Sequence, residues 1–156
     1  DRLRSRGLGD VYKRQLIGNP GILILDEPTA GLDPKERIRI RNLISEVAKD
    51  KIVIIATHVV TDVEFIAKEI VMLSNGKIIR SGSPSKLLNE LDGKVWNIFL
   101  SDNEIDEVNT RYKVSNISRD ADGVIARIIA DSYDGIWQKE AVRPNLEDLY
   151  LYLNGD

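Results

Sequence analysis

Residues 21 to 34 read GILILDEPTAGLDP, and the interpretation of the chain begins from this stretch. The aliphatic run from Ile22 to Leu25 predicts a short strand buried on both faces, as is typical of parallel sheets. Asp26 and Glu27 follow directly, and Pro28 ends the strand. Because ligands of parallel sheets bind beyond the carboxyl ends of the strands, we expect the two acids to lie at a ligand-binding edge.

Two adjacent carboxylates at a strand end can have different roles, since neighbouring strand residues point to opposite sides. One can hold a hydrated magnesium ion, which prefers carboxylate oxygens and keeps several waters. The other can orient and deprotonate a water for attack on a γ-phosphate. A solvated strand end without chemistry is the alternative. The combination of LDEPT with GLDP in one stretch favours the functional interpretation.

The segment after this stretch predicts a helix. Asp33 is a good N-cap, Pro34 suits the first helical position, and Glu36 has the spacing of a capping box. Apolar residues then recur at helical spacing as far as Val47. The sequence KIVIIATH, which ends at His58, predicts a second buried strand because it is rich in β-branched residues.

A short helix over residues 63–67 and a third strand over residues 69–74 are predicted next. Asn75 and Gly76 predict a tight hairpin turn into residues 77–80. The order strand, helix, strand, helix, strand predicts an α/β fold with a parallel sheet and right-handed crossovers.

The composition changes after residue 92. The segments KVWNIFLS, YKVSNISR and GVIARIIA predict strands, and acidic, turn-rich pieces separate them. Asn145 is placed to cap a last helix with apolar residues at helical spacing. Residues 93–156 are therefore predicted to form a small α+β subdomain.

Composition bounds the function. The 156 residues are 42% hydrophobic and 30% charged, which suits one globular domain or slightly more. The net charge of −3 gives no electrostatic reason to expect a nucleic-acid partner. No cysteine occurs, so disulfides and thiolate metal sites are excluded. The apolar runs are too short to span a bilayer, so a membrane role would come through a partner.

Residues 1–15 differ from the rest of the chain. The sequence SRGLGDVYKRQ, residues 5–15, matches a translation of a DNA string that resembles the transposase adapter used in sequencing libraries. The alternative is a natural basic N-terminal arm. Such a processing scar would not contribute to the fold. We therefore expect the natural chain to begin at Leu16, as the back part of a longer protein.

Three segments together resemble a known family. ILILDEPTAGLDP resembles the Walker B and D-loop segment of ABC-type ATPases, and IIATH, ending at His58, resembles their switch histidine. VMLSNGKIIRSGSPSKLL resembles the strand, hairpin and helix that follow, and the spacing fits from Leu16 to about Leu91. The ending VRPNLEDLYLYL more loosely resembles the C-terminal extension of one exporter-type subgroup of ATP-binding subunits.

The resemblance implies roles for single residues. Asp26 would support Mg²⁺ through water, Glu27 would be the general base for the attacking water, and His58 would contact the γ-phosphate. ATP would be sandwiched between two subunits. The D-loop, which reaches the partner subunit's nucleotide site, would be formed by Ala30, Gly31, Leu32 and Asp33.

The resemblance also implies a domain organisation. Residues 1–15 are predicted to be an adapter artefact. Residues 16–92 would be the C-terminal part of an ABC ATPase domain, with the C-terminal half of a P-loop parallel sheet. Residues 93–156 would be the C-terminal α+β extension. In this family a further strand lies between those ending at residues 56 and 73, so we expect no ladder between the latter two.

The chain contains no G-x-x-x-x-G-K-[ST] phosphate loop, no Q-loop and no LSGGQ-like signature. Backbone amides and the lysine of that loop supply much of the nucleotide affinity of a P-loop site. The intact parent is therefore expected to be an ATPase with ATP and Mg²⁺ as cofactors. This segment alone is expected to be inactive.

The function favoured by these features is the ATP-hydrolysing subunit of a membrane transporter. Its expected partners are a transmembrane permease subunit and a second ATP-binding subunit, identical or different. Its expected location is cytoplasmic and peripheral, at the inner face of the cell membrane. One alternative is a soluble ABC-type ATPase acting on DNA or ribosomes, although neither heptads nor strong positive charge is present. Another is a non-catalytic interaction fragment.

Overall fold

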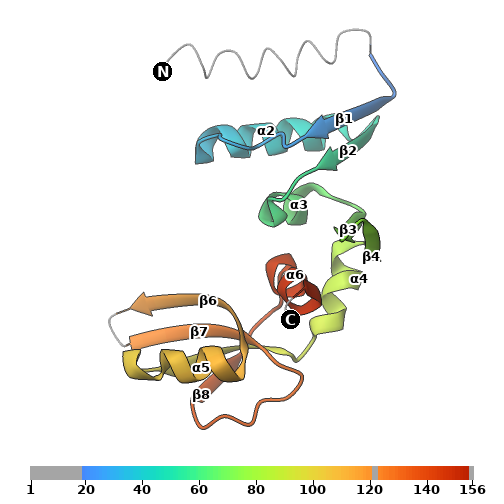
Figure 1. Ribbon diagram of the computed structural model, residues 1–156. Helices are drawn as coiled ribbons and strands as arrows, with labels where there is room; N and C mark the ends of the chain where they lie inside the picture. Colours follow the sequence, from blue (N-terminus) through green and yellow to red (C-terminus); the bar gives the residue numbers. More distant parts are fainter. Residues whose placement is uncertain (1–18, 121–122, 155–156) are drawn as a thin grey trace. The chain divides into compact units, whose positions relative to one another are not determined.

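The computed structural model describes residues 19–120 and 123–154 (Figure 1). The segment interpreted as an adapter, residues 1–15, lies outside the described residues. The chain divides into two compact units between Ile66 and Ala67.

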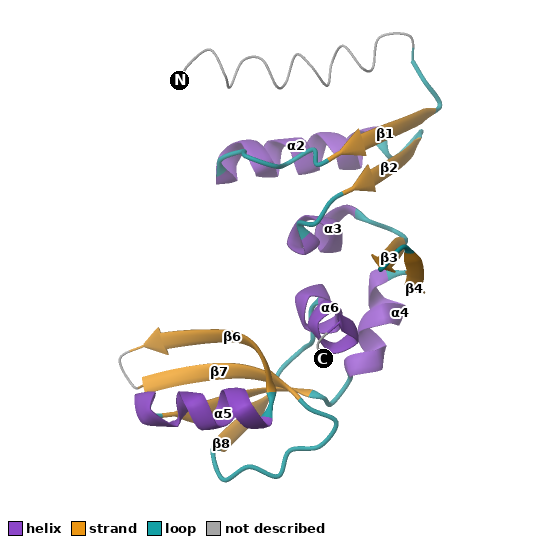
Figure 2. Ribbon diagram, in the orientation of Figure 1, coloured by secondary structure: helices purple, strands orange, loops and turns teal. Residues whose placement is uncertain are grey.

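Within residues 19–66, the part of the first unit that the structure describes, lie two parallel strands and two helices (Figure 2). Strand β1 (Ile22–Asp26) is followed by helix α2 (Pro34–Val47), strand β2 (Ile52–Ala56) and helix α3 (Val60–Ile66). β1 and β2 pair in parallel, in a register that runs from Ile22 opposite Ile52 to Asp26 opposite Ala56. The predicted strands, their parallel pairing and the long helix are confirmed, whereas the prediction that the strands are buried on both faces is wrong for the described residues, because one face of each strand is exposed.

Helix α2 covers one face of this strand pair. Leu25 of β1 is buried against Ile40 and Ile44 of α2, and these three residues form the core of the unit. Partly buried apolar side chains surround this core, namely Leu23, Leu32, Val53, Ile55 and Ile66. The alternation of the strand residues therefore gives each strand one face toward the helix.

The other face of the strand pair is open in the described residues. Ile22, Ile24, Ile52 and Ile54 are between 51% and 69% exposed. Parallel sheets are normally covered on both faces, and a contiguous apolar surface promotes association. This face, here called the isoleucine face, is therefore expected to promote self-association of the unit.

The second unit begins with a hairpin. Strand β3 (Ile70–Ser74) pairs antiparallel with β4 (Lys77–Gly82). Asn75 and Gly76 have φ values of 50° and 73°, as a type I′ turn requires, so the predicted hairpin turn is confirmed. Among the described strands, β2 pairs only with β1, and β3 only with β4. Only the β1–β2 part of the predicted parallel sheet is therefore present as a ladder, and the strand order of a P-loop sheet stays a prediction.

The rest of the second unit is built on a four-stranded antiparallel sheet, in which the strand order is β6-β7-β5-β8. Helix α4 (Pro84–Leu88) and a 3-10 turn, η1 (Asn89–Leu91), lead into it. The remaining elements are β5 (Val95–Leu100), the 3-10 turn η2 (Asp102–Glu104), α5 (Ile105–Arg111), β6 (Lys113–Asp120), β7 (Gly123–Ile129), β8 (Gln138–Ala141) and α6 (Leu146–Asn154). Three of these strands and the last helix were predicted, whereas α5 and β8 were not.

The sheet and α5 enclose a core that includes Ile98, Val108, Ala126, Ile128 and Trp137. Helix α4 contacts both β4 and α6, so the hairpin belongs to the same compact unit as the sheet. This division after residue 66 differs from the predicted boundary after residue 92. A division by compactness does not test the predicted domain boundary, which stays a prediction.

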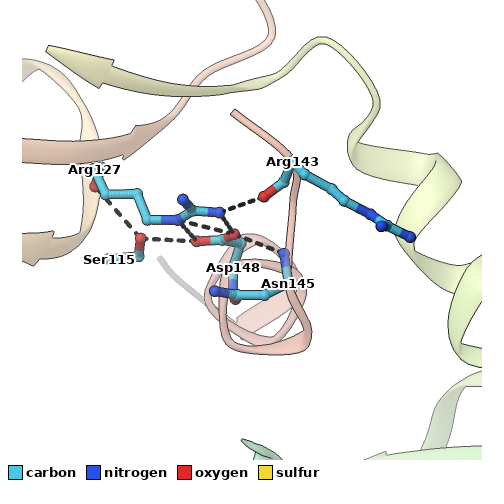
Figure 3. Close-up of polar contacts among 5 residues, drawn as sticks. All are labelled: Ser115, Arg127, Arg143, Asn145 and Asp148. Atoms are coloured by element: carbon cyan, nitrogen blue, oxygen red, sulfur yellow. Dashed lines mark hydrogen bonds and ion pairs between the residues drawn. The ribbon is translucent and has the colours of Figure 1, made fainter. Parts of the chain in front are cut away.

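A buried ion pair fastens the last helix to the sheet (Figure 3). Asp148 of α6 is fully buried, and Arg127 of β7 donates to it from Nε at 3.0 Å and from Nη2 at 2.7 Å. The Ser115 hydroxyl and the Asn145 backbone N–H donate to the same carboxylate, at 2.8 and 2.9 Å. The Asn145 side chain in turn accepts from the Asp148 N–H, which confirms Asn145 as the predicted cap.

Breaking this pair is expected to destabilise the second unit. Asp148→Ala leaves Arg127 without its partner, and removing one member of a buried pair costs about 3–5 kcal/mol in the free energy of unfolding. Glu147→Ala, at an exposed position in the same helical turn, is the matched control and should cost much less. Urea unfolding measures both variants, and equal stabilities would contradict the structural role of Asp148.

The isoleucine face gives a second prediction. Ile24→Thr combined with Ile54→Thr keeps β-branched residues in the strands but makes the exposed face polar. Self-association, measured by sedimentation velocity, should fall while the unfolding midpoint stays close to that of the parent chain. The control is Val53→Thr on the helix-covered face, which should cost about 1–3 kcal/mol because it buries a hydroxyl. Unchanged association in the double variant would contradict this prediction.

Candidate functional site

The parallel pairing of β1 and β2 brings their carboxyl ends together. The ladder extends one residue past β1, because the Glu27 N–H donates to the Ala56 carbonyl at 2.8 Å. Glu27 has φ of 46°, in the left-handed region that non-glycine residues rarely adopt. The chain therefore turns away at Glu27 and leaves this side chain at the strand edge, as predicted from the LDEPT sequence.

The Glu27 carboxylate contacts the two residues that follow β2. The Thr57 hydroxyl donates to Oε2 at 2.8 Å, and the His58 backbone N–H donates to Oε1 at 2.9 Å. The His58 ring Nδ1 lies 2.6 Å from the same Oε1. The Glu27 side chain is 34% exposed and that of His58 is 81% exposed. The structure thus brings together two of the predicted site residues, Glu27 and His58.

These contacts affect the ionisation of Glu27. The hydrogen bond from the His58 side chain is the largest cause that holds the pKa of the Glu27 carboxyl below its ordinary value. Partial burial opposes this effect, whereas the Thr57 hydroxyl and the His58 N–H lower the pKa further. The site therefore favours the carboxylate, which is the form that can accept a proton.

Asp26 lies at the end of β1 with its side chain exposed. Its carboxylate makes no hydrogen bond or ion pair with the part of the chain that the structure describes. Mg²⁺ commonly uses one or two carboxylates and completes its shell with waters and substrate phosphates. One free carboxylate at a strand end fits this pattern. Residues 19–120 and 123–154 contain no cluster of three or more potential metal-ligating side chains.

The predicted D-loop residues form a tight connection between β1 and α2. The Ala30 N–H donates to the Glu27 carbonyl at 3.2 Å, and Gly31 adopts φ of 70°, which favours glycine. Leu32 packs on the core beneath α2. Asp33 caps the helix, because its Oδ1 accepts from the Glu36 N–H at 2.9 Å. The loop is thus anchored at both ends, with Ala30, Gly31 and Asp33 exposed.

Thr57 was missed when the site was interpreted from the sequence. Its hydroxyl also accepts from the Val59 N–H at 3.0 Å, so it links the carboxylate to the start of α3. A hydroxyl residue directly before a strand-end histidine is a signal that the sequence contains. Pairing with Glu27 depends on the register of β1 and β2, which the sequence pattern alone did not give.

Relatives of known class were found for about half of the chain. It is 39% identical over 71 residues to ABC transporter A family member 8 of Dictyostelium discoideum, and the aligned residues make up 46% of the chain and 8% of that protein. It is 42% identical over 78 residues to the energy-coupling factor transporter ATP-binding protein EcfA2 of Lactococcus lactis subsp. cremoris, and here the aligned residues make up 49% of the chain and 27% of that protein.

A human relative, ATP-binding cassette sub-family A member 9, is 43% identical over 68 residues, or 44% of the chain and 4% of that protein. No family model matches the chain. Roughly half of this chain is thus homologous to ABC transporter ATP-binding proteins, as the sequence motifs predicted. The matches span less than a third of each of these relatives. The helices in the described parts of the chain are all too short or too polar to cross a membrane.

The cap at the start of α2 can be tested separately from any chemistry. Asp33→Ala removes the acceptor for the Glu36 N–H and should lower the free energy of unfolding of the first unit by about 1 kcal/mol. Asp33→Asn keeps a side-chain oxygen at the cap and should remain close to the parent chain. Thermal unfolding followed by circular dichroism measures the difference, and equal stability of the alanine and asparagine variants would contradict the capping role.

Proposed function

We propose that this chain is part of the ATP-hydrolysing subunit of a membrane transporter. The single observation that carries the proposal is the Glu27 carboxylate, fixed beside His58 where two parallel strands end. The homology of about half the chain to ABC transporter ATP-binding proteins supports the same class.

In this proposal Glu27 is the general base. Its carboxylate takes a proton from a water molecule, and the water oxygen bonds to the γ-phosphorus as the bond to the β–γ bridging oxygen breaks. Charge develops on the γ-phosphate oxygens during this step. The exposed His58 ring is able to turn from Glu27 toward the phosphate and stabilise that charge.

The remaining site residues bind and orient. Asp26 would hold Mg²⁺ through water, and the ion would supply positive charge that neutralises the phosphates. The D-loop formed by Ala30, Gly31, Leu32 and Asp33 extends to the nucleotide site of a second ATP-binding subunit. Its anchored ends and exposed middle suit a contact with another chain.

The transporter partner is proposed to be a transmembrane permease subunit. The ATP-binding subunit would then lie in the cytoplasm, peripheral to the inner face of the cell membrane. Nucleic acid is not among the proposed partners, since the chain has a net charge of −3.

The role of Glu27 predicts a specific variant behaviour in the intact subunit that contains this segment. Glu27→Gln removes the base with little change in shape, so turnover should be abolished while ATP binding is kept. An ATP-bound dimer should accumulate and be visible by size-exclusion chromatography. His58→Ala should also lose most turnover, because a transition-state contact is removed.

The matched control for this experiment is Glu46→Gln on the exposed surface of α2, whose carboxylate pairs only with Lys49 among the described residues. Its steady-state phosphate release should equal that of the parent protein. Phosphate release by Glu27→Gln at the parent rate would contradict the role of Glu27 as the base.

The segment alone gives a further prediction. Without a phosphate-binding loop in the sequence, we expect its ATP affinity to be weaker than a Kd of about 1 mM, or roughly −4 kcal/mol. Isothermal titration calorimetry with Mg-ATP measures this directly. Micromolar binding would show that these residues hold nucleotide in another way.

A further inference from the structure

The Thr57 hydroxyl has a defined direction. Its oxygen accepts the Val59 N–H at 3.0 Å, and it lies 2.8 Å from Oε2 of Glu27. A hydroxyl has one proton, and the carboxylate can only accept, so this proton points to Oε2. Thr57 is half-buried directly after β2, and its branched Cβ restricts χ1. The hydroxyl is therefore a fixed donor rather than a mobile surface group.

The two oxygens of Glu27 are held in different ways. Oε2 is contacted by the fixed Thr57 hydroxyl. Oε1 accepts from the His58 backbone N–H and also meets the His58 ring, which is mostly exposed. When the ring turns away, Oε1 keeps its backbone donor and gains an open lone pair. Oε2 does not gain an open lone pair in this way, because the Thr57 hydroxyl remains hydrogen-bonded to it.

We propose that Thr57 is a positioning residue whose hydroxyl anchors Oε2 of Glu27 and so presents Oε1 to the attacking water. This inference rests on the proposed role of Glu27 as the base. Thr57 was not among the predicted site residues, and in this inference it determines which oxygen of the Glu27 carboxylate reacts. Without the anchor, the His58 N–H remains as the fixed donor to the carboxylate, so rotation about its last bond is less restricted and its alignment with the water is impaired.

The test compares variants of Thr57 in the intact ATP-binding subunit that contains this segment. Thr57→Val keeps the shape and loses the hydroxyl, Thr57→Ala loses it without placing a methyl group against Oε2, and Thr57→Ser keeps it. Thr110→Val is the matched control, because that exposed hydroxyl on α5 donates only to the Asp106 carbonyl among the described residues.

The expected result is a split between kcat and KM. The valine and alanine variants should lose about tenfold to a hundredfold in kcat, as small misplacements of a reacting group do, with KM for ATP unchanged. The serine variant should restore most of the lost kcat, and the Thr110 control should match the parent. A purely structural role of Thr57, through the hydrogen bond that its hydroxyl accepts from the Val59 N–H, would lower stability without this split between kcat and KM.

Hydrogen exchange in the same variants is a second measurement. Because Thr57 holds the carboxylate against the His58 N–H, exchange of the His58 amide hydrogen should be faster in the valine and alanine variants, and slow again in the serine variant. Parent-like exchange in both hydroxyl-free variants would overturn the anchoring contact.

The kinetic outcomes separate this inference from the proposed function. An inactive Glu27→Gln variant, together with parent-like kcat in both hydroxyl-free variants of Thr57, would overturn the inference and leave Glu27 as the base. Equal loss in the serine and valine variants would also overturn it. Full turnover by Glu27→Gln would overturn the proposed function, and the positioning role with it.

Discussion

The parallel register of β1 and β2 is the constraint on which the candidate site depends. It sets Asp26 opposite Ala56, and the next residue, Glu27, then meets Thr57 and His58. A slip by one residue would move the carboxylate by about 3.3 Å and turn the strand's side chains to the other face. The core of Leu25, Ile40 and Ile44 fixes which face of β1 lies against α2. Packing of the helix and alignment of the site are thus consequences of the same register.

Each unit contains a carboxylate that accepts several hydrogen bonds, Glu27 in the first unit and Asp148 in the second, and the surroundings of the two carboxylates differ. Asp148 is fully buried, and its donors are the paired Arg127, Ser115 and the backbone N–H of Asn145, the residue that caps its helix. This saturation compensates the cost of burying a charge and fastens α6 to the sheet. Glu27 is partly exposed, and one of its contacts, the His58 ring, is mostly exposed. Saturation by buried donors suits a structural carboxylate, whereas an exposed contact suits the reacting role proposed for Glu27.

The sequence predicted the parts of the fold that depend on local patterns. The strand before Asp26, the helix capped by Asp33 and the turn at Asn75 each have a short-range signal, and each was confirmed. Strand β8, with the sequence QKEA, was missed because it is exposed at all four positions and lacks apolar alternation. The Arg127–Asp148 pair and the Thr57–Glu27 contact join residues far apart in the sequence, so they depend on register and packing that no local pattern shows. The roles of the site residues stay predictions.

The central claim is that Glu27 aligns a water molecule for attack on a γ-phosphate. A crystal structure of the intact subunit with Mg²⁺ and a non-hydrolysable ATP analogue tests it most directly. The account predicts a water within hydrogen-bond distance of Glu27 Oε1, in line with the γ-phosphorus, while the Thr57 hydroxyl remains on Oε2. A Glu27 side chain turned away from the γ-phosphate, with the water held by other residues, would contradict the account.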